Sequence, residues 1–261
     1  GPAQTMETTT IEIENVVAYN NVNMQNSGGF INNFENVEPS LLILNVNNSA
    51  FSNNVGSYTG GVFALSNVHA TITNSLFDNN NTRNYGGVFY GRSSSYSQFS
   101  LVISGSEFTN NYADYFGGAI HLEYTENDTS ASGLSGLYVA NSTFSGNRTN
   151  YSGGAISTDG YNGDMVVYET DFNNNTTDSY GGALYVRYKT DAYFNNVSFD
   201  NNMVEYGHGG AIYLYNNTAG NNLDFHHSSF TNNSSDASGG VFYSRDRYGD
   251  TDLNIYSSDF I

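Results

Sequence analysis

The sequence predicts an all-β solenoid, a right-handed parallel β-helix of about eight coils, and three observations lead to that prediction. An F-x-x-N motif occurs seven times, a Gly-Gly pair follows each copy at a nearly constant distance, and apolar residues alternate with period two after each pair. The Phe-to-Phe spacing of 26 to 36 residues is typical of stacked repeats rather than of an ordinary globular fold. One elongated domain over residues 1–261 is therefore expected.

The F-x-x-N motif is expected to supply the buried column of each coil. Its aromatic members are Phe51, Phe77, Phe108, Phe144, Phe172, Phe199 and Phe230, and its amides are Asn54, Asn80, Asn111, Asn147, Asn175, Asn202 and Asn233. Tyr19 and Gly28 keep the same spacing near the start of the sequence. Coils stacked in register place like residues above like, so we predict stacked rings and a hydrogen-bonded amide ladder.

The Gly-Gly pair follows nine residues after each Phe and is expected to turn the chain. The pairs begin at Gly60, Gly86, Gly117, Gly153, Gly181, Gly209 and Gly239, the one at Gly209 being a residue late. Two glycines in a row permit a positive φ and a close approach between neighbouring backbones. A corner is therefore predicted at each pair.

Two strands are predicted in the remainder of each coil. One follows the Gly-Gly pair, as in Ala119-Ile120-His121-Leu122, and one precedes the next motif, with apolar residues five and seven positions before the Phe, as at Ile103 and Leu101. A Ser or Thr two positions before the Phe does not fit the apolar alternation of the preceding strand. This break in the alternation indicates another corner. Only the segment from Gly-Gly to the next Phe varies in length, so we expect loops along one edge, the longest at 92–98 and 123–135.

Composition limits the partners of this chain. With 25 acidic and 7 basic residues, the formal charge of −18 repels phosphate backbones, so no nucleic acid is expected as a partner. The absence of Cys excludes disulfides and thiolate metal sites. No apolar run reaches the roughly 20 residues of a membrane helix, so we expect no membrane insertion by this segment.

The ends of the sequence suggest a piece of a longer array. Gly1-Pro2 is typical of a protease-cleavage scar, and residues 253–260 open a coil that no Gly-Gly pair follows. We therefore expect a fragment whose open edge permits end-to-end self-association.

The pairing of F-x-x-N with G-G-A-I, as in Phe108 to Asn111 with Gly117-Gly118-Ala119-Ile120, resembles the repeat of the chlamydial polymorphic outer membrane proteins. The pairing returns after Phe144 and after Phe199. That resemblance implies a β-helical passenger that acts as an adhesin at the cell surface. Three units read G-G-V-F instead, and the chain lacks Cys, so the resemblance implies a fold and a class but no receptor.

A strip of Tyr and Arg side chains is the candidate binding site. The third and fifth residues after each Gly-Gly pair point outward by the alternation, and they include Tyr90, Arg92, His121, Tyr185, Arg187, Tyr213, Tyr215, Tyr243 and Arg245. With Lys189 and Arg247 beside it, this strip holds most of the cations of the chain. Tyrosine rings beside guanidinium groups stack on sugars and bind carboxylates. The alternative is that these residues form solvated cross-strand pairs that only stabilise the sheet.

The sequence favours a non-enzymatic, extracellular or cell-surface rod that binds a protein receptor or a glycan without a cofactor. The first alternative is a carbohydrate-active enzyme, because many β-helices cleave polysaccharides with paired carboxylates. Gly207-His208-Gly209 resembles a motif of polygalacturonases, but no Asp pair accompanies it, so we expect His208 in a turn and no catalytic residue. The adjacent His226 and His227 face opposite ways on a strand, so no metal site is expected. A structural spacer is the third possibility.

Overall fold

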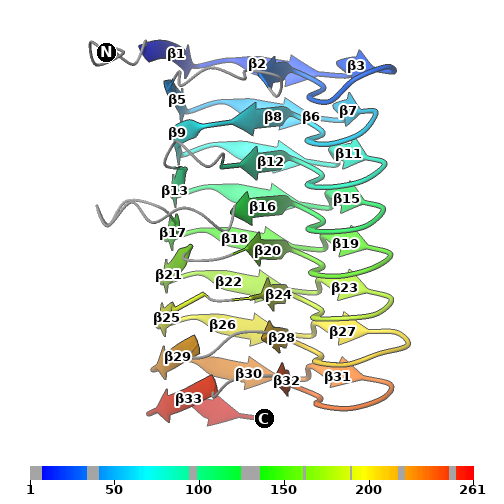
Figure 1. Cartoon of the computed structure of the whole chain (residues 1–261), viewed down its shortest axis with the longest axis vertical. Helices are drawn as coiled ribbons and strands as arrows, with labels where there is room; N and C mark the ends of the chain where they lie inside the picture. The colour runs from blue at the N-terminus through cyan, green and yellow to red at the C-terminus, as the bar shows by residue number, and fades with distance from the viewer. Residues whose placement is uncertain are drawn as a thin grey trace, which may run out of the picture.

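The computed structural model describes residues 8–33, 41–93, 99–124, 136–160, 163–188, 190–216, 221–246 and 251–261, without the side chains of Asn216 and Asn221. These residues form four parallel sheets that run along one rod, with each coil contributing one strand to each sheet (Figure 1). The predicted right-handed parallel β-helix is confirmed. The described residues contain no helix that could cross a membrane.

Two of the sheets have nine strands. Sheet A consists of β1 (Thr8–Glu14), β5 (Leu41–Asn47), β9 (Val68–Thr73), β13 (Ser100–Ser104), β17 (Gly136–Ala140), β21 (Asp164–Tyr168), β25 (Ala192–Asn195), β29 (Asn221–His226) and β33 (Thr251–Tyr256). Sheet B consists of β2 (Val17–Tyr19), β6 (Ala50–Ser52), β10 (Leu76–Asp78), β14 (Glu107–Thr109), β18 (Thr143–Ser145), β22 (Asp171–Asn173), β26 (Ser198–Asp200), β30 (Ser229–Thr231) and β34 (Asp259–Phe260).

The other two sheets have eight strands. Sheet C consists of β3 (Val22–Asn23), β7 (Val55–Gly56), β11 (Asn81–Thr82), β15 (Tyr112–Ala113), β19 (Arg148–Thr149), β23 (Thr176–Thr177), β27 (Met203–Val204) and β31 (Ser234–Ser235). Sheet D consists of β4 (Ile31–Asn33), β8 (Phe63–Ser66), β12 (Phe89–Arg92), β16 (Ile120–Tyr124), β20 (Ile156–Gly160), β24 (Leu184–Arg187), β28 (Ile212–Asn216) and β32 (Phe242–Asp246). Sheet C was not predicted, because two-residue strands carry no periodic signal.

The Phe residues of the motif form one buried stack inside sheet B. Neighbouring rings from Phe51 to Phe260 have centroids 4.7 to 5.1 Å apart and planes within 13° of parallel. The predicted place of Tyr19 in this column is wrong. Ala18 pairs with Phe51 and occupies the position, while Tyr19 is exposed, because the first coil carries one extra residue before its Gly-Gly pair.

The Asn residues of the motif form the amide ladder that the repeat predicts. The Nδ2 group of Asn147 donates to Asn175 Oδ1 at 3.0 Å and to the Phe108 carbonyl at 2.9 Å. Its Oδ1 accepts from the backbone N–H and the side-chain amide of Asn111. The amide therefore uses both donors and its acceptor although the side chain is fully buried, which removes the cost of an unpaired polar group.

Asn also makes two of the corners. Asn48 between sheets A and B and Asn53 between sheets B and C have φ values of 46° and 56°, and equivalent Asn residues repeat in most coils. Asn adopts this left-handed conformation more readily than other residues that carry a side chain. The abundance of Asn thus has a conformational cause in addition to the ladder.

The Gly-Gly pair makes the corner between sheets C and D, as predicted. Gly117 has a φ of 63°, and a Cβ atom on Gly118 would lie 2.1 Å from the Gly154 carbonyl oxygen of the next coil. The first glycine therefore supplies the backbone conformation, and the second permits the coils to approach each other.

The variable segment connects sheet D to sheet A. Its length ranges from one residue, between Ser66 and Val68, to eleven, between Tyr124 and Gly136. The large length changes thus occur at this edge, as predicted, whereas the corner between sheets C and D varies by one residue, before Gly28 and before Gly209. The two longest predicted loops fall mainly at 94–98 and 125–135, outside the described residues.

The Phe stack should dominate the stability of the rod. Phe172 is fully buried between Phe144 and Phe199, so Phe172→Ala is expected to lower the free energy of unfolding by about 3–5 kcal/mol through the cavity that it leaves. Chemical denaturation measures this loss, with Met203→Ala on the outer face of sheet C as a control that should change stability by less than about 0.5 kcal/mol. Equal effects of the two substitutions would contradict the stacking argument.

Candidate functional site

The predicted Tyr and Arg strip lies on the outer face of sheet D, where the structure separates it into two columns. The first, here called the covered column, comprises Ala64, Tyr90, His121, Ser157, Tyr185, Tyr213 and Tyr243. The second, here called the charged column, comprises Ser66, Arg92, Glu123, Asp159, Arg187, Tyr215 and Arg245. Parallel pairing places each member directly beside its equivalent on the next strand.

The covered column points away from the core as predicted, yet most of its side chains are buried. Tyr90, His121 and Tyr213 are only 2%, 1% and 2% exposed, and Tyr185 is buried as well. Tyr243 on β32 is half-buried. The expectation that these side chains form a free surface is therefore wrong for Tyr90, His121, Tyr185 and Tyr213.

A second layer of side chains covers this column. The residue immediately before each Gly-Gly pair folds back over sheet D and forms a bridge to its equivalent in the next coil, at Thr59, Tyr85, Phe116, Ser152, Tyr180, His208 and Ser238. The ring of Tyr180 lies 4.6 Å from that of Tyr213, and the ring of Phe116 lies 5.5 Å from that of His121. The aromatic residues before Gly-Gly were the available signal for this layer, which the sequence interpretation missed.

His208 belongs to the covering layer. Its ring stacks on Tyr243 at 4.4 Å and on Tyr180 at 6.1 Å. The prediction of a turn position agrees with its place before Gly209. The expectation that His226 and His227 face opposite ways on one strand is wrong: the His226 ring lies 5.2 Å from that of Tyr193 on the outer face of sheet A, and His227 is the exposed corner residue after the strand, with a φ of 51°.

Glu123 lies at the junction of the two columns. Its carboxylate accepts a hydrogen bond from the Tyr90 hydroxyl at 2.8 Å and lies 3.6 Å from His121 Nε2 and 3.7 Å from Arg92 Nε. Burial alone would raise the pKa of Glu123, but the contacts with His121, Tyr90 and Arg92 outweigh it and hold that pKa below its ordinary value. Glu123 is therefore a carboxylate near neutral pH.

Burial and neighbouring groups also keep the covered tyrosines protonated. Burial, with a smaller effect of Tyr180, raises the pKa of Tyr213 to about 12. Burial raises the pKa of Tyr90 further, with an additional effect of the Glu123 charge. The Tyr90 hydroxyl therefore donates a hydrogen bond to Glu123 and does not act as a base.

The charged column forms a partly accessible line of two ion pairs, one tyrosine ring and a further arginine. Arg187 Nη1 lies 2.9 Å from Asp159 Oδ2, and its guanidinium group lies over the Tyr215 ring at 5.7 Å. The guanidinium of Arg245 lies 5.8 Å from the same ring. Two cations thus flank one tyrosine on neighbouring strands, an arrangement that can bind a carboxylate and stack on a flat apolar group. Lys189 and Arg247, predicted beside this strip, lie outside the described residues.

Two carboxylates meet in the same column. Glu123 and Asp159 are register partners on β16 and β20. Each faces an arginine, Arg92 for Glu123 and Arg187 for Asp159. This juxtaposition was not recognised from the sequence, although both residues occupy the fifth position after Gly-Gly.

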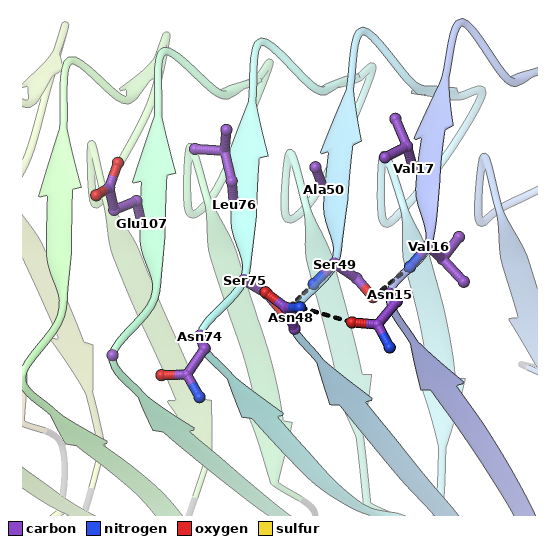
Figure 2. A pocket seen from close by; sticks show the side chains of 11 residues that line it. Asn15, Val16, Val17, Asn48, Ser49, Ala50, Asn74, Ser75, Leu76 and Glu107 are labelled. Carbon is purple, nitrogen blue, oxygen red and sulfur yellow. Dashed lines mark hydrogen bonds between the residues drawn. The ribbon is translucent and has the colours of Figure 1, made fainter.

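A groove of about 490 Å³ follows the corner between sheets A and B in the first coils. Figure 2 shows Val17, Ala50 and Leu76 in a row along it, with the corner amides below them. Asn48 Nδ2 donates to Asn15 Oδ1 at 2.6 Å, so these amides largely satisfy each other. Among the lining residues the only ionisable one is Glu107, and the groove therefore offers less specific chemistry than the charged column.

No group of three or more His, Asp and Glu side chains in the described ranges is placed to hold a metal ion.

The buried position of Tyr213 generates a stability prediction. Tyr213→Ala is expected to lower the free energy of unfolding by about 3 kcal/mol, because it opens a cavity beneath Tyr180. Tyr58→Ala, at a ring that is 55% exposed, is the matched control and should change stability by less than about 0.5 kcal/mol. A negligible effect of Tyr213→Ala in denaturant unfolding would contradict the covering layer.

Glu123 generates a pH prediction. A lowered carboxyl pKa means that the ionised group stabilises the fold above its ordinary pKa of 4.5, and that this contribution is lost as pH falls through the lower folded-state pKa. Glu123→Gln should therefore be less stable than the natural chain at neutral pH, and the difference should shrink below about pH 4. Thermal unfolding between pH 3 and 7 measures it; a difference that grows in acid would reverse the assignment.

Comparisons with known proteins agree with the geometry. Residues 61–260 match the family described as the right handed beta helix region. The chain is also 30% identical over 230 residues to the probable autotransporter YfaL of Escherichia coli (strain K12), an alignment that covers 83% of this chain and 17% of that protein. No solved structure matches the chain significantly. The match to the family covers most of the chain, and the chain belongs to the right-handed β-helix family.

Proposed function

We propose that this chain is a binding rod displayed outside the cell, and that its charged column engages a receptor or a glycan at a host or neighbouring cell. The similarity to a probable autotransporter supports display at the surface. The F-x-x-N and G-G-A-I pairing, which resembles the chlamydial polymorphic outer membrane proteins, supports an adhesive role.

The arrangement of Arg187, Tyr215 and Arg245 carries this proposal. The three side chains come from neighbouring strands in register, and both guanidinium groups lie within 6 Å of the Tyr215 ring. Arg245 is exposed and forms no ion pair within the described part of the chain. Arginine and tyrosine are enriched among the residues that dominate binding interfaces.

The chemistry of this cluster favours a ligand that carries a carboxylate beside an apolar surface. A guanidinium group binds a carboxylate through two parallel hydrogen bonds, and a tyrosine face packs on the C–H face of a sugar or on an apolar side chain. An acidic sugar and an acidic protein loop both have this chemistry. The net charge of −18 repels long polyanions. The favoured ligand therefore carries its negative charge at one place only.

Substitutions in the cluster test the proposal. Arg245→Ala and Tyr215→Ala should each weaken binding of the purified chain to receptor-bearing cells by about tenfold, the effect of losing one good interface contact. Arg148→Ala is the matched control, because Arg148 forms a comparable ion pair with Asp178 at 3.3 Å on sheet C. Unchanged binding in both cluster variants would refute the assignment, and a chain that binds no cell would favour a structural spacer.

A polysaccharide-cleaving enzyme is the second candidate, favoured by the adjacent carboxylates Glu123 and Asp159. A general acid needs a carboxyl pKa that is raised towards neutrality, whereas the contacts of Glu123 lower its pKa. Asp159 is bound by Arg187. We therefore expect no release of reducing ends or unsaturated products from polysaccharides. If products are released and both Glu123→Gln and Asp159→Asn abolish that release, the protein is an enzyme instead.

A further inference from the structure

The outer face of sheet A carries a second line of aromatic side chains. The strands that carry it run from β17 to β33, in the C-terminal part of the rod (Figure 1). Its members are Tyr138, Tyr168, Tyr193, His226 and Tyr256, here called the aromatic stripe. Successive ring centroids lie 6.0, 5.7, 5.2 and 4.7 Å apart. Since each ring comes from the next strand, the stripe extends for about 19 Å at about 4.8 Å between strands.

This stripe differs from the covered column of sheet D in accessibility. Tyr138 is 41% exposed, and Tyr168 and Tyr193 are half-buried, whereas Tyr90 and Tyr213 on sheet D are 2% exposed. The hydroxyls of Tyr138 and Tyr168 make no hydrogen bond within the described part of the chain. The outward parts of these rings and the hydroxyls of Tyr138 and Tyr168 are therefore available to a ligand.

The stripe crosses between two neighbouring register columns, and hydrogen-bonding groups continue the column of Tyr138 and Tyr193. The register places Tyr193 beside Asp224, and Asp224 beside Asn254. Asn254 Nδ2 donates to Asp224 Oδ1 at 2.9 Å, and Asn222 Nδ2 donates to Asp224 Oδ2 at 3.1 Å. Planar amides and a carboxylate are thus fixed at the edge of the rings, where they can accept and donate hydrogen bonds to hydroxyl groups.

The charge of this face restricts the ligand. None of the nine described strands of sheet A contains Lys or Arg, whereas Asp164, Asp224 and Asp252 add negative charge to its second half. A polyanion would be repelled, and the described strands of this sheet offer no guanidinium group to bind a carboxylate. A neutral sugar has apolar C–H faces that can pack on the rings. It also has hydroxyl groups that can form hydrogen bonds with the Asn and Asp side chains.

We infer that the aromatic stripe is a binding platform for a neutral polysaccharide chain lying along the rod axis. This site is separate from the charged column, and its ligand differs in chemical class. The rod would thus hold a neutral glycan on sheet A independently of any partner on sheet D.

Affinity gel electrophoresis of the purified chain tests this inference directly. The gels contain a neutral polysaccharide (galactomannan, arabinoxylan or hydroxyethyl cellulose) or, for comparison, anionic alginate. At least one neutral polysaccharide should retard the natural chain, and alginate should not. Tyr138→Ala and Tyr193→Ala should weaken the retardation at least tenfold, while Tyr193→Phe, which keeps the ring, should retain most of it.

Two controls separate this site from the rest of the surface. Tyr58→Ala removes an exposed tyrosine outside the stripe and should leave the retardation unchanged. Arg245→Ala, which tests the charged column in the cell-binding experiment, should also leave the retardation unchanged. The proposal for the charged column and the inference for the aromatic stripe can therefore fail independently. Thermal unfolding shows whether each variant is folded; if Tyr193→Ala is not, Tyr138→Ala, at the more exposed ring, decides.

The inference is overturned if no neutral polysaccharide retards the chain, or if alginate retards it equally. It is also overturned if Tyr58→Ala weakens the retardation as much as the stripe variants do. If light scattering shows that the natural chain is a dimer and that Tyr138→Ala is a monomer, while the gels show no effect, the stripe contacts a second copy of the chain instead.

Discussion

Parallel backbone hydrogen bonding in register is the constraint on which the other features of this rod depend. It places each residue about 4.8 Å from its equivalent in the next coil, so every position along the coil becomes a column. A column is stable only if its residue type tolerates contact with itself. Phe rings stack, Asn amides donate to and accept from each other, and the second glycine of each pair allows the backbone oxygens to approach.

The same constraint explains why Asn is so abundant. In the ladder, Asn147 satisfies its amide entirely through neighbouring coils, whereas at the corners Asn48 and Asn53 provide the left-handed backbone conformation. Replacing one ladder residue would leave donors and acceptors of two neighbours unpaired in the interior. The Phe and Asn columns are thus uniform, and the coils differ mainly on the outer faces, in the apolar side chains of sheets A and D, and in the connections from sheet D to sheet A.

The outer faces have different chemistry although they share one scaffold. Sheet D is partly closed by the residues before Gly-Gly, and this second layer leaves the charged column as its accessible edge. On sheet A, Tyr138 is exposed, and Tyr168 and Tyr193 remain partly open to solvent. The two proposed sites would therefore prefer different ligands, one with a carboxylate on sheet D and a neutral one on sheet A, while sharing one scaffold.

The sequence alone determined the fold, the register and the interior columns, because a strict repeat in a parallel stack leaves one consistent arrangement for Phe108, Asn111 and Gly117. It also indicated the outward phase of Tyr90 and Tyr213, which is a local property of a strand. Only the tertiary structure decided that these rings are buried, since their cover comes from Tyr85 and Tyr180 across a corner whose geometry no periodicity encodes. Likewise, the ring of Tyr138 lies 6.0 Å from that of Tyr168 although the register pairs Tyr138 with Val166, so this contact depends on side-chain packing between columns and not on the repeat.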